Sequence, residues 1–208
     1  MKTRRWIQGF FLLVFTGVMI SGKLPVWMMI FGASLLAATL FSRFYCGWIC
    51  PINTLTEVVN WFYKRRGIKR KPVPKWVKSP ALRFVILAAF IAMMIITLRT
   101  GIRLPVLPAL LAVGVLLTLF YVPALWHRYL CPYGTALSLP GSVARKKFIV
   151  VEDKCTGCSI CEKVCPAEAV DISSDPKKAT ISHSKCLACT ACAQACPTNA
   201  IVYGRGEV

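Results

Sequence analysis

The chain has 208 residues, with 26 Lys and Arg against 8 Asp and Glu, and a formal net charge of +18. Residues 1–147 hold 20 of the basic residues and a single acidic one and are strongly apolar, whereas residues 148–208 hold 6 basic and 7 acidic residues. Because the basic residues flank apolar runs and form no soluble basic domain, the composition excludes a nucleic-acid-binding protein and favours contact with an anionic membrane surface.

Four apolar runs predict helices at residues 6–20, 24–41, 82–98 and 104–126. Each has about the length needed to cross a hydrocarbon core of about 30 Å, although the first is short. Buried helices of a soluble protein would show an alternating polar face, which these runs lack. We therefore expect four transmembrane helices. The basic start of the first run also resembles a signal peptide, but three further runs argue against that reading.

Basic residues between the runs predict the orientation. They are concentrated before the first run, between the second and third, and after the fourth, whereas the other side has only Lys23, Arg99 and Arg103. The positive-inside rule then places both termini in the cytoplasm. The expected location is the inner, cytoplasmic membrane, crossed several times.

Two segments of the apolar half repeat one pattern. The first reads Cys46-Gly-Trp-Ile-Cys50-Pro51, and the second reads His127-Arg-Tyr-Leu-Cys131-Pro132. A spacing of four places both donors on one face of a helix, and the proline then redirects the chain. If the two helical hairpins pack together, they form a Cys3His set of Cys46, Cys50, His127 and Cys131.

The sequence leaves several alternatives for what this Cys3His set binds. Thiolates with an imidazole suit a third iron–sulfur centre, Cu(I) or Zn(II). Transient thiol chemistry is a second possibility, and a third is that the cysteines are small buried hydrophobes beside a chance histidine. The repeat argues against chance.

Two copies of the spacing C-x2-C-x2-C-x3-C-P close the chain. This spacing is typical of bacterial ferredoxins with two [4Fe–4S] clusters, in which the fourth cysteine of each run ligates the other cluster. Zinc sites would show two C-x2-C pairs, so zinc is disfavoured, as are disulfides. The first cluster is expected on Cys155, Cys158, Cys161 and Cys196, and the second on Cys186, Cys189, Cys192 and Cys165.

The charge and motif boundaries predict two domains. Residues 1–147 form the four-helix transmembrane domain with the Cys/His-Pro motifs, and residues 148–208 form an α+β ferredoxin domain of pseudo-twofold βαβ type. A region of about 60 residues can bury little core, so we expect the clusters to contribute to its folding.

On these motifs the chain resembles the NapH-type polytopic membrane ferredoxins, which are quinol dehydrogenase subunits. Nitrous oxide reductase accessory proteins and cytochrome oxidase assembly ferredoxins share the motif pattern. The resemblance covers nearly the whole chain, and it implies electron exchange between the quinone pool and a redox partner complex. The chain departs from the pattern at His127, where those families carry cysteine.

The expected function is therefore that of a membrane electron-transfer subunit. Its partners would be the lipid bilayer, other subunits of a redox complex and an electron donor or acceptor, with no nucleic acid. No motif in the sequence identifies a catalytic residue. Quinol oxidation would need a base to accept the released protons, and His127 and Glu57 are the candidates. A quinone pocket, less expected than an interfacial aromatic belt, could use the aromatic side chains Tyr45, Trp48, Trp126, Tyr129 and Tyr133.

Two alternatives belong to other functional classes. A metallocentre assembly factor would use Cys46, Cys50 and Cys131 to bind or reduce a metal for a client protein. A structural anchor would only hold a ferredoxin wire within a larger complex, without a quinone site.

Overall fold

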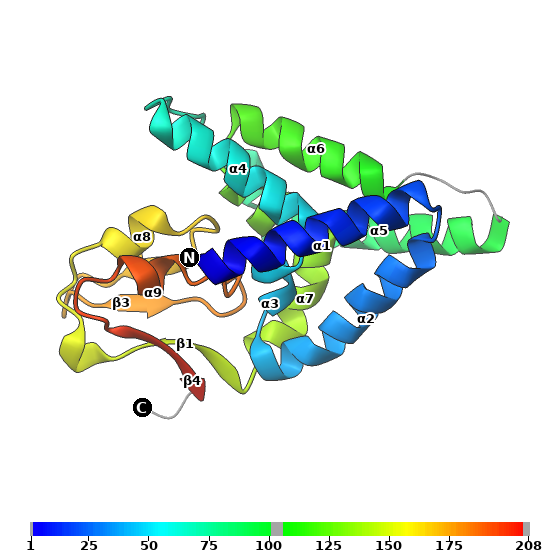
Figure 1. The fold of residues 1–208 in the computed structure, drawn as a ribbon. Helices are drawn as coiled ribbons and strands as arrows, with labels where there is room; N and C mark the ends of the chain where they lie inside the picture. The colour runs from blue at the N-terminus through cyan, green and yellow to red at the C-terminus, as the bar shows by residue number, and fades with distance from the viewer. Residues whose placement is uncertain (1, 101–105, 206–208) are drawn as a thin grey trace. The chain divides into compact units, whose positions relative to one another are not determined.

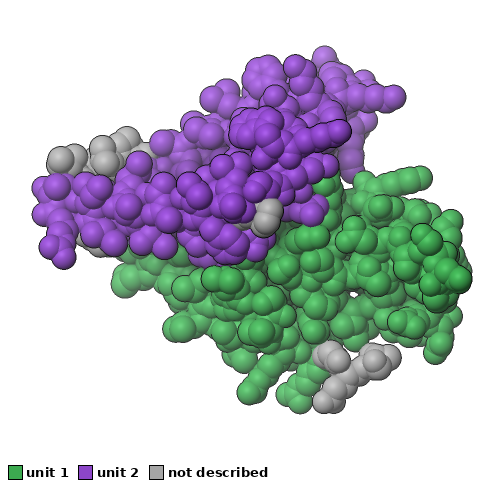
Figure 2. All heavy atoms as spheres, turned by 180° about the vertical axis from the view of Figure 1, so that it is seen from behind, with its two compact units in different colours: residues 1–50, 137–208 green, residues 51–136 purple. Residues whose placement is uncertain are grey.

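The computed structural model describes residues 2–100 and 106–205, and most of this part of the chain is helical (Figure 1). It folds into two compact units, coloured separately in Figure 2. Unit 1 comprises residues 1–50 and 137–208, and unit 2 comprises residues 51–136. These units are defined by packing, whereas the boundary at residue 148 is defined by composition and motifs, so that boundary stays a prediction.

A helical hairpin opens unit 1. It consists of α1 (Lys2–Ile20) and α2 (Leu24–Phe41), and the short helix α3 (Phe44–Trp48) follows. The turn between α1 and α2 uses Gly22 at φ +67°, a left-handed conformation that costs glycine little. Trp27 of α2 is 2% exposed and packs edge-to-face against Phe15 of α1. Its indole N–H donates to the hydroxyl of Tyr45 in α3 at 3.1 Å. This contact joins all three helices.

The rest of unit 1 is an α+β region with two antiparallel strand pairs. Strand β1 (Lys146–Val150) pairs with β4 (Ile201–Arg205), and β2 (Val170–Ile172) pairs with β3 (Ala179–Ile181). Between the strands lie the 3-10 turn η3 (Glu152–Lys154) and the helices α8 (Ile160–Val164) and α9 (Ala191–Ala195). The helix α7 (Pro132–Ser142) begins in unit 2, and its part from residue 137 onward belongs to unit 1 and leads into β1.

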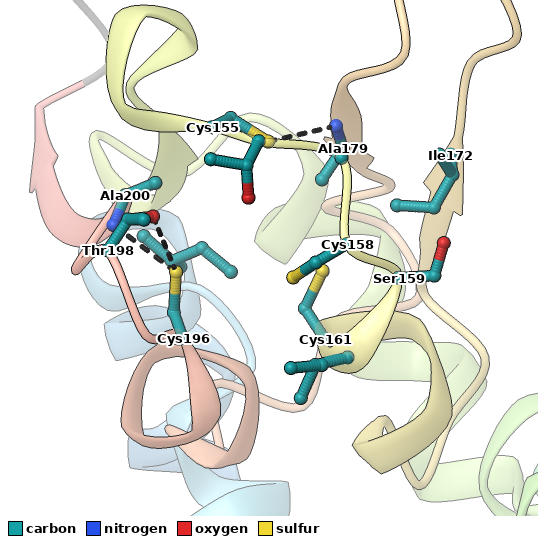
Figure 3. A pocket seen from close by; sticks show the side chains of 13 residues that line it. Cys155, Cys158, Ser159, Cys161, Ile172, Ala179, Cys196, Thr198 and Ala200 are labelled. Carbon is teal, nitrogen blue, oxygen red and sulfur yellow. Dashed lines mark hydrogen bonds between the residues drawn. The ribbon is translucent and has the colours of Figure 1, made fainter.

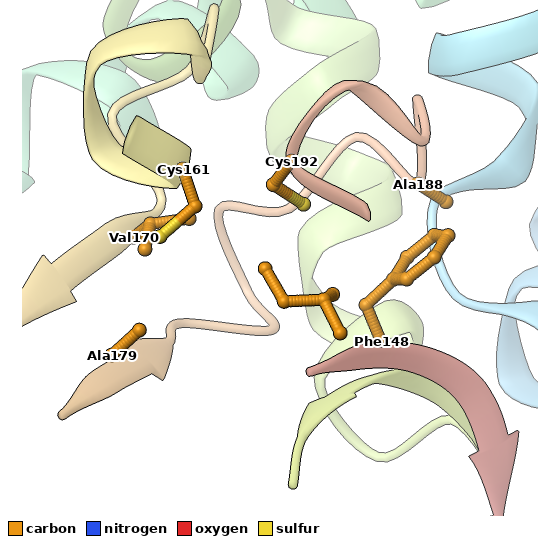
Figure 4. Packing of buried hydrophobic residues seen from close by; sticks show 7 residues of the cluster. Phe148, Cys161, Val170, Ala179, Ala188 and Cys192 are labelled. Carbon is orange, nitrogen blue, oxygen red and sulfur yellow. The ribbon is translucent and has the colours of Figure 1, made fainter. Parts of the chain in front are cut away.

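The core of this α+β region is small and includes cysteines. Phe148 of β1 packs with Val170, Ala179 and Ile201 from the other strands, and Cys161 and Cys192 complete the cluster (Figure 4). Branched and aromatic residues in strands favour this packing. Because this core is small, we expect bound clusters to contribute to the folding of the region.

Unit 2 contains α4 (Pro51–Arg65), η1 (Lys75–Lys78), α5 (Pro80–Thr100), α6 (Val106–Phe120) and the π-helical turn η2 (Leu125–Leu130). A Cβ on Gly114 of α6 would lie 2.8 Å from Ile52 and 2.9 Å from Trp126. Glycine at this position therefore lets α4 and η2 approach α6. A second core forms around Val73, Val77, Ala124, Leu125 and Tyr129.

The prediction of four transmembrane helices is overturned. Within residues 2–100 and 106–205, the structure contains no helix that combines the length and the apolar character needed to cross a membrane. The physical reason is the length of each apolar stretch, since a span needs about 20 apolar residues. Helix α6 has 15 residues and α2 has 18, α1 begins with Arg4 and Arg5 in its first turns, and α5 carries Arg83 and Arg99.

The predicted location depends on those spans. The positive-inside rule applies to helices that cross a bilayer, and no such helix is found in the described residues, so the rule gives no orientation for them. The multi-pass inner-membrane location, with both termini cytoplasmic, is corrected accordingly. Arg103 and the start of the fourth apolar run, at Leu104, lie outside the described residues.

Candidate functional site

The first pocket of the α+β region gathers cysteines from both closing runs. Its empty volume is about 330 Å³, and Figure 3 shows four sulfur atoms around it. Cys155 and Cys158 lie between η3 and α8, Cys161 lies in α8, and Cys196 follows α9. Cys158 is exposed, so this pocket is open to solvent on one side.

Backbone N–H groups point at the sulfurs of this pocket. Ala179 donates to Cys155 Sγ at 3.5 Å, and Ala200 donates to Cys196 Sγ at 3.3 Å. Burial alone would raise the pKa of the Cys196 thiol, but hydrogen bonds from Thr198, Ala200 and Ile201 together lower it. Such bonds favour the thiolate, which is the form that ligates iron.

The second pocket is formed in the same way and lies deeper. It has an empty volume of about 340 Å³ and is lined by Cys165, Cys186, Cys189 and Cys192. Ala169 donates to Cys165 Sγ at 3.2 Å, and Ala188 donates to Cys186 Sγ at 3.4 Å. Burial raises the pKa of both Cys189 and Cys192 to about 12. Thiolates at these positions therefore require a bound cation, and iron coordination supplies one.

The loops that carry the cysteines share one backbone device. Ser159 precedes α8 at φ 62° and Thr190 precedes α9 at φ 64°, so each run turns through a left-handed residue just before its third cysteine. In the first loop, Gly157 also has φ +65°, and a Cβ there would lie 2.3 Å from the Lys177 carbonyl oxygen. Only glycine fits at this position.

Replacing Gly157 with alanine should therefore loosen the first pocket. The left-handed conformation alone costs about 1–3 kcal/mol for a residue with a side chain, and the contact with backbone adds to it. We expect a lower midpoint for thermal bleaching of the cluster absorbance. Gly204→Ala is the matched control, because nothing lies within 4 Å of its added Cβ. Equal midpoints for the two variants would contradict the packing argument.

The two copies of the Cys/His-Pro motif have the same local geometry. The Cys50 N–H bonds to the Tyr45 carbonyl at 2.9 Å, and the Cys131 N–H bonds to the Trp126 carbonyl at 2.9 Å. Helix α3 ends at Trp48 and η2 ends at Leu130, so each cysteine follows its helix and does not share it with the first donor. The proline after each cysteine explains this, since it disfavours helical geometry in the residue before it.

The donors of these motifs are buried in separate units. Cys46 and Cys50 belong to unit 1, at 6% and 8% exposure, whereas His127 and Cys131, both at 6%, belong to unit 2. Within each unit of the described chain, no group of three or more metal-binding side chains includes any of these four donors. The Cys3His centre stays a prediction.

His127 takes part in a buried polar network of unit 2. Its Nε2 lies 3.1 Å from the Thr56 hydroxyl, which itself donates to the Asn53 carbonyl at 3.0 Å. The Asn53 side-chain amide donates to Glu57 Oε1 at 3.0 Å. Both residues expected as candidate bases therefore bond to neighbouring residues of α4.

Comparisons with known proteins agree with the cysteine geometry. A family described as "4Fe-4S dicluster domain" matches residues 154–201, and one described as "4Fe-4S binding domain" matches residues 24–69 and 104–150, which contain the two motif copies. A methylamine utilization ferredoxin-type protein MauN from Methylorubrum extorquens is 28% identical over 71% of this chain and 56% of its own. The ferredoxin-type protein NapH of Haemophilus influenzae is 26% identical, with the same two coverages. The chain is therefore similar to NapH-type ferredoxins over most of its length, as its motifs predict.

Other relatives extend this family beyond one pathway. The putative electron transport protein YccM of Escherichia coli is 24% identical over 72% of this chain and 49% of its own length. The chain thus spans about half the length of these curated relatives. No solved structure matches. The family matches confirm the expected cofactors, two [4Fe–4S] clusters, and the relatives are ferredoxin-type proteins.

A contact with the second cysteine run is absent from the sequence-based prediction. The segment around α3 packs against the loop from Ser184 to Cys189, all within unit 1. Trp48 donates its indole N–H to the Ala188 carbonyl at 3.0 Å, and a Cβ on Gly47 would lie 2.4 Å from the Leu187 carbonyl oxygen. Arg43 donates to the Ser184 carbonyl at 3.0 Å, and Arg4 of α1 donates to the Cys189 carbonyl. The only available signal was Gly47, a small residue between a cysteine and a tryptophan.

Proposed function

We propose that this chain is an electron-transfer subunit that passes single electrons between a donor and a redox partner through its two clusters. The observation that carries the proposal is the pair of four-cysteine pockets, each completed by a cysteine from the other run. When bound, the clusters supply the one-electron redox chemistry.

We assign the ligands by pocket. Cys155, Cys158, Cys161 and Cys196 hold the first cluster, and Cys165, Cys186, Cys189 and Cys192 hold the second. The donor set supports this, since each pocket offers four sulfurs and backbone N–H groups directed at them. Those N–H groups stabilise negative charge on the sulfurs, so they favour the reduced state.

The exposed rim of the first pocket suits it to exchange electrons with a diffusing partner. Cys158 is exposed, whereas Cys189 and Cys192 of the second pocket are buried. The second pocket instead lies against α1 and α3 of the same unit. Electrons would therefore enter or leave at Cys158 and pass inward toward the helical part of unit 1.

The finer proposal is that a quinone is the other redox partner, as the family resemblance implies. Quinol oxidation releases protons, and unit 2 offers two side chains that can accept one, the imidazole of His127 beside Thr56 and the carboxylate of Glu57 beside Asn53. Of the aromatic side chains considered for a quinone pocket, Tyr45 is buried in unit 1, and Trp126, Tyr129 and Tyr133 are buried in unit 2.

The test uses the purified holoprotein under anaerobic conditions. We expect about eight irons per chain, bleaching of the cluster absorbance by a chemical reductant, and recovery on reoxidation. A water-soluble quinol analogue should bleach the clusters of the wild type more slowly than the chemical reductant does. The His127→Gln variant should lower the rate of bleaching by the quinol and leave the rate with the chemical reductant unchanged. No reversible bleaching with any reductant would overturn electron transfer, and bleaching by the chemical reductant alone would overturn the quinone link.

The same preparation tests the alternative that the chain is a metallocentre assembly factor. Three buried cysteines outside the two pockets favour this alternative: Cys46, Cys50 and Cys131. Stoichiometric copper bound to the wild type and lost in Cys46→Ser would support it. Copper binding that is unchanged in Cys46→Ser would count against it.

A further inference from the structure

Arg43 is a buried cation at the start of α3. The residue is 2% exposed, and its guanidinium donates to the Ser184 carbonyl at 3.0 Å and to the Cys46 sulfur. Gly141 of α7 makes room for it, since a Cβ there would lie 2.8 Å from Arg43 Cγ. The fold therefore holds this side chain inside unit 1, and does not let it extend into solvent.

A buried charge needs a partner, because removing it from water costs several kcal/mol. Within the described residues, Arg43 forms no ion pair with a carboxylate, and its Nε has no hydrogen-bond partner. Its guanidinium instead lies against the ligand loop of the second pocket, where it bonds to the carbonyl of Ser184, two residues before Cys186. A cluster held by four thiolates is anionic, so it would be the missing counter-charge.

A second arginine approaches the same pocket from α1. Arg4 donates to the Cys189 carbonyl, and its charge acts on the Cys189 thiol. Two guanidinium groups from the helical part of unit 1 thus converge on the ligand loop of the second pocket.

The first pocket has a different electrostatic environment. Lys178 donates to the backbone carbonyls of Glu152 and Cys155 at 2.6 and 2.7 Å. Its side chain is only half-buried, and Glu152 itself is an exposed acidic residue. A charge near solvent is screened far more than a buried one. The positive potential is therefore stronger at the second pocket.

We propose that Arg43, supported by Arg4, raises the reduction potential of the second cluster above that of the first. Reduction by one electron adds one negative charge to the cluster, and a fixed buried cation stabilises that charge. Electrons that enter at the exposed first pocket then come to rest on the second cluster, beside α1 and α3. This inference rests on the ligand assignment of the proposed function.

The test is a potentiometric titration of the holoprotein, followed by electron paramagnetic resonance. We expect Arg43→Gln to lower one of the two midpoint potentials by about 59 mV. For a one-electron step, this shift corresponds to about a tenfold change in the equilibrium constant for reduction. Arg43→Lys keeps the charge and should shift it less. Cys158→Ala, which removes a ligand of the first pocket, identifies the wave that belongs to the second cluster.

Two matched controls separate this effect from general charge loss. Arg5 lies beside Arg4 on α1 but is exposed, so Arg5→Gln should leave both potentials unchanged. Lys178→Gln should move only the wave of the first cluster, if it moves either. Iron content and circular dichroism verify that each variant is folded and loaded.

The outcomes are distinct. If Arg43→Gln retains both clusters but moves neither wave, or moves both equally, the inference is overturned. If Arg43→Gln loses iron, Arg4→Gln on the less buried side chain takes its place, with the same direction of shift expected. A wild type without two one-electron waves would overturn the proposed function itself, whereas two waves that ignore both arginines would overturn only the inference.

Discussion

Replacing Cys165 with alanine is expected to remove the second cluster and spare the first. Cys165 lies in the first cysteine run, but it lines the pocket formed by Cys186, Cys189 and Cys192 of the second run. We expect the iron content to fall by about half, from about eight atoms per chain. The remaining cluster should be the solvent-accessible one, which a hydrophilic oxidant bleaches quickly because Cys158 is exposed.

The reciprocal variant is the control for this prediction. Cys196→Ala should remove the accessible cluster and leave the buried one, which bleaches slowly. Cys131→Ala, in unit 2, lies outside both pockets and should leave both clusters in place. If Cys165→Ala instead left the slowly bleaching cluster, each run would hold its own cluster and the crossed assignment would be wrong.

Replacing Gly47 with alanine is expected to disrupt the packing of α3 on the second cysteine run. The added Cβ would lie 2.4 Å from the Leu187 carbonyl oxygen and 3.1 Å from Cys189 Cα. These are backbone atoms, so neither can rotate away, and overpacking of this kind costs about 1–3 kcal/mol. We expect a lower thermal midpoint and faster loss of the second cluster to a chelator.

Gly9→Ala on α1 is the matched control, since nothing lies within 4 Å of its added Cβ. In a helix this change should be stabilising by about 0.5–1 kcal/mol. The two variants make the same chemical change with opposite expected signs. A Gly47→Ala protein as stable as Gly9→Ala, with unchanged chelator kinetics, would show that α3 does not press on the ligand loop.

The contact around Gly47 also joins the first motif copy to the loop of the second cysteine run. Cys46 and Trp48 flank the glycine, and Trp48 bonds to Ala188, between the ligands Cys186 and Cys189. Arg43 connects the Cys46 sulfur to the same loop through Ser184. Measurements on Gly47→Ala and Arg43→Gln therefore address one interface, the first by packing and the second by charge.

The cysteine spacing by itself determined the cofactors. Two runs of C-x2-C-x2-C-x3-C-P encode short loops whose geometry depends on neighbouring residues, and such local patterns are readable without a fold. The repeat of the Cys/His-Pro motif was readable for the same reason, and both copies have the same hydrogen bond from the cysteine N–H. The sequence also indicated the family, which the comparisons confirm.

Hydropathy misled the interpretation of the helices. Apolar runs at residues 6–20 and 82–98 predict spans, but a window of hydropathy does not weigh the arginines at the helix ends or the length over which the chain stays helical. In the described residues, the helices α1, α2, α5 and α6 fall short on length or apolar character. The orientation inferred from Lys and Arg was wrong because it depended on those spans.

Only the tertiary structure decided what surrounds each cluster pocket. Arg4, Arg43 and Trp48 lie about 140 residues or more before the loop that they contact, and nothing in their local sequence distinguishes them from other basic or aromatic residues. The spacing of the cysteines determines how the chain wraps a cluster, because that is a property of a few bonds. The electrostatic difference between the two pockets is a property of long-range packing, since a charge acts strongly only where the fold excludes water.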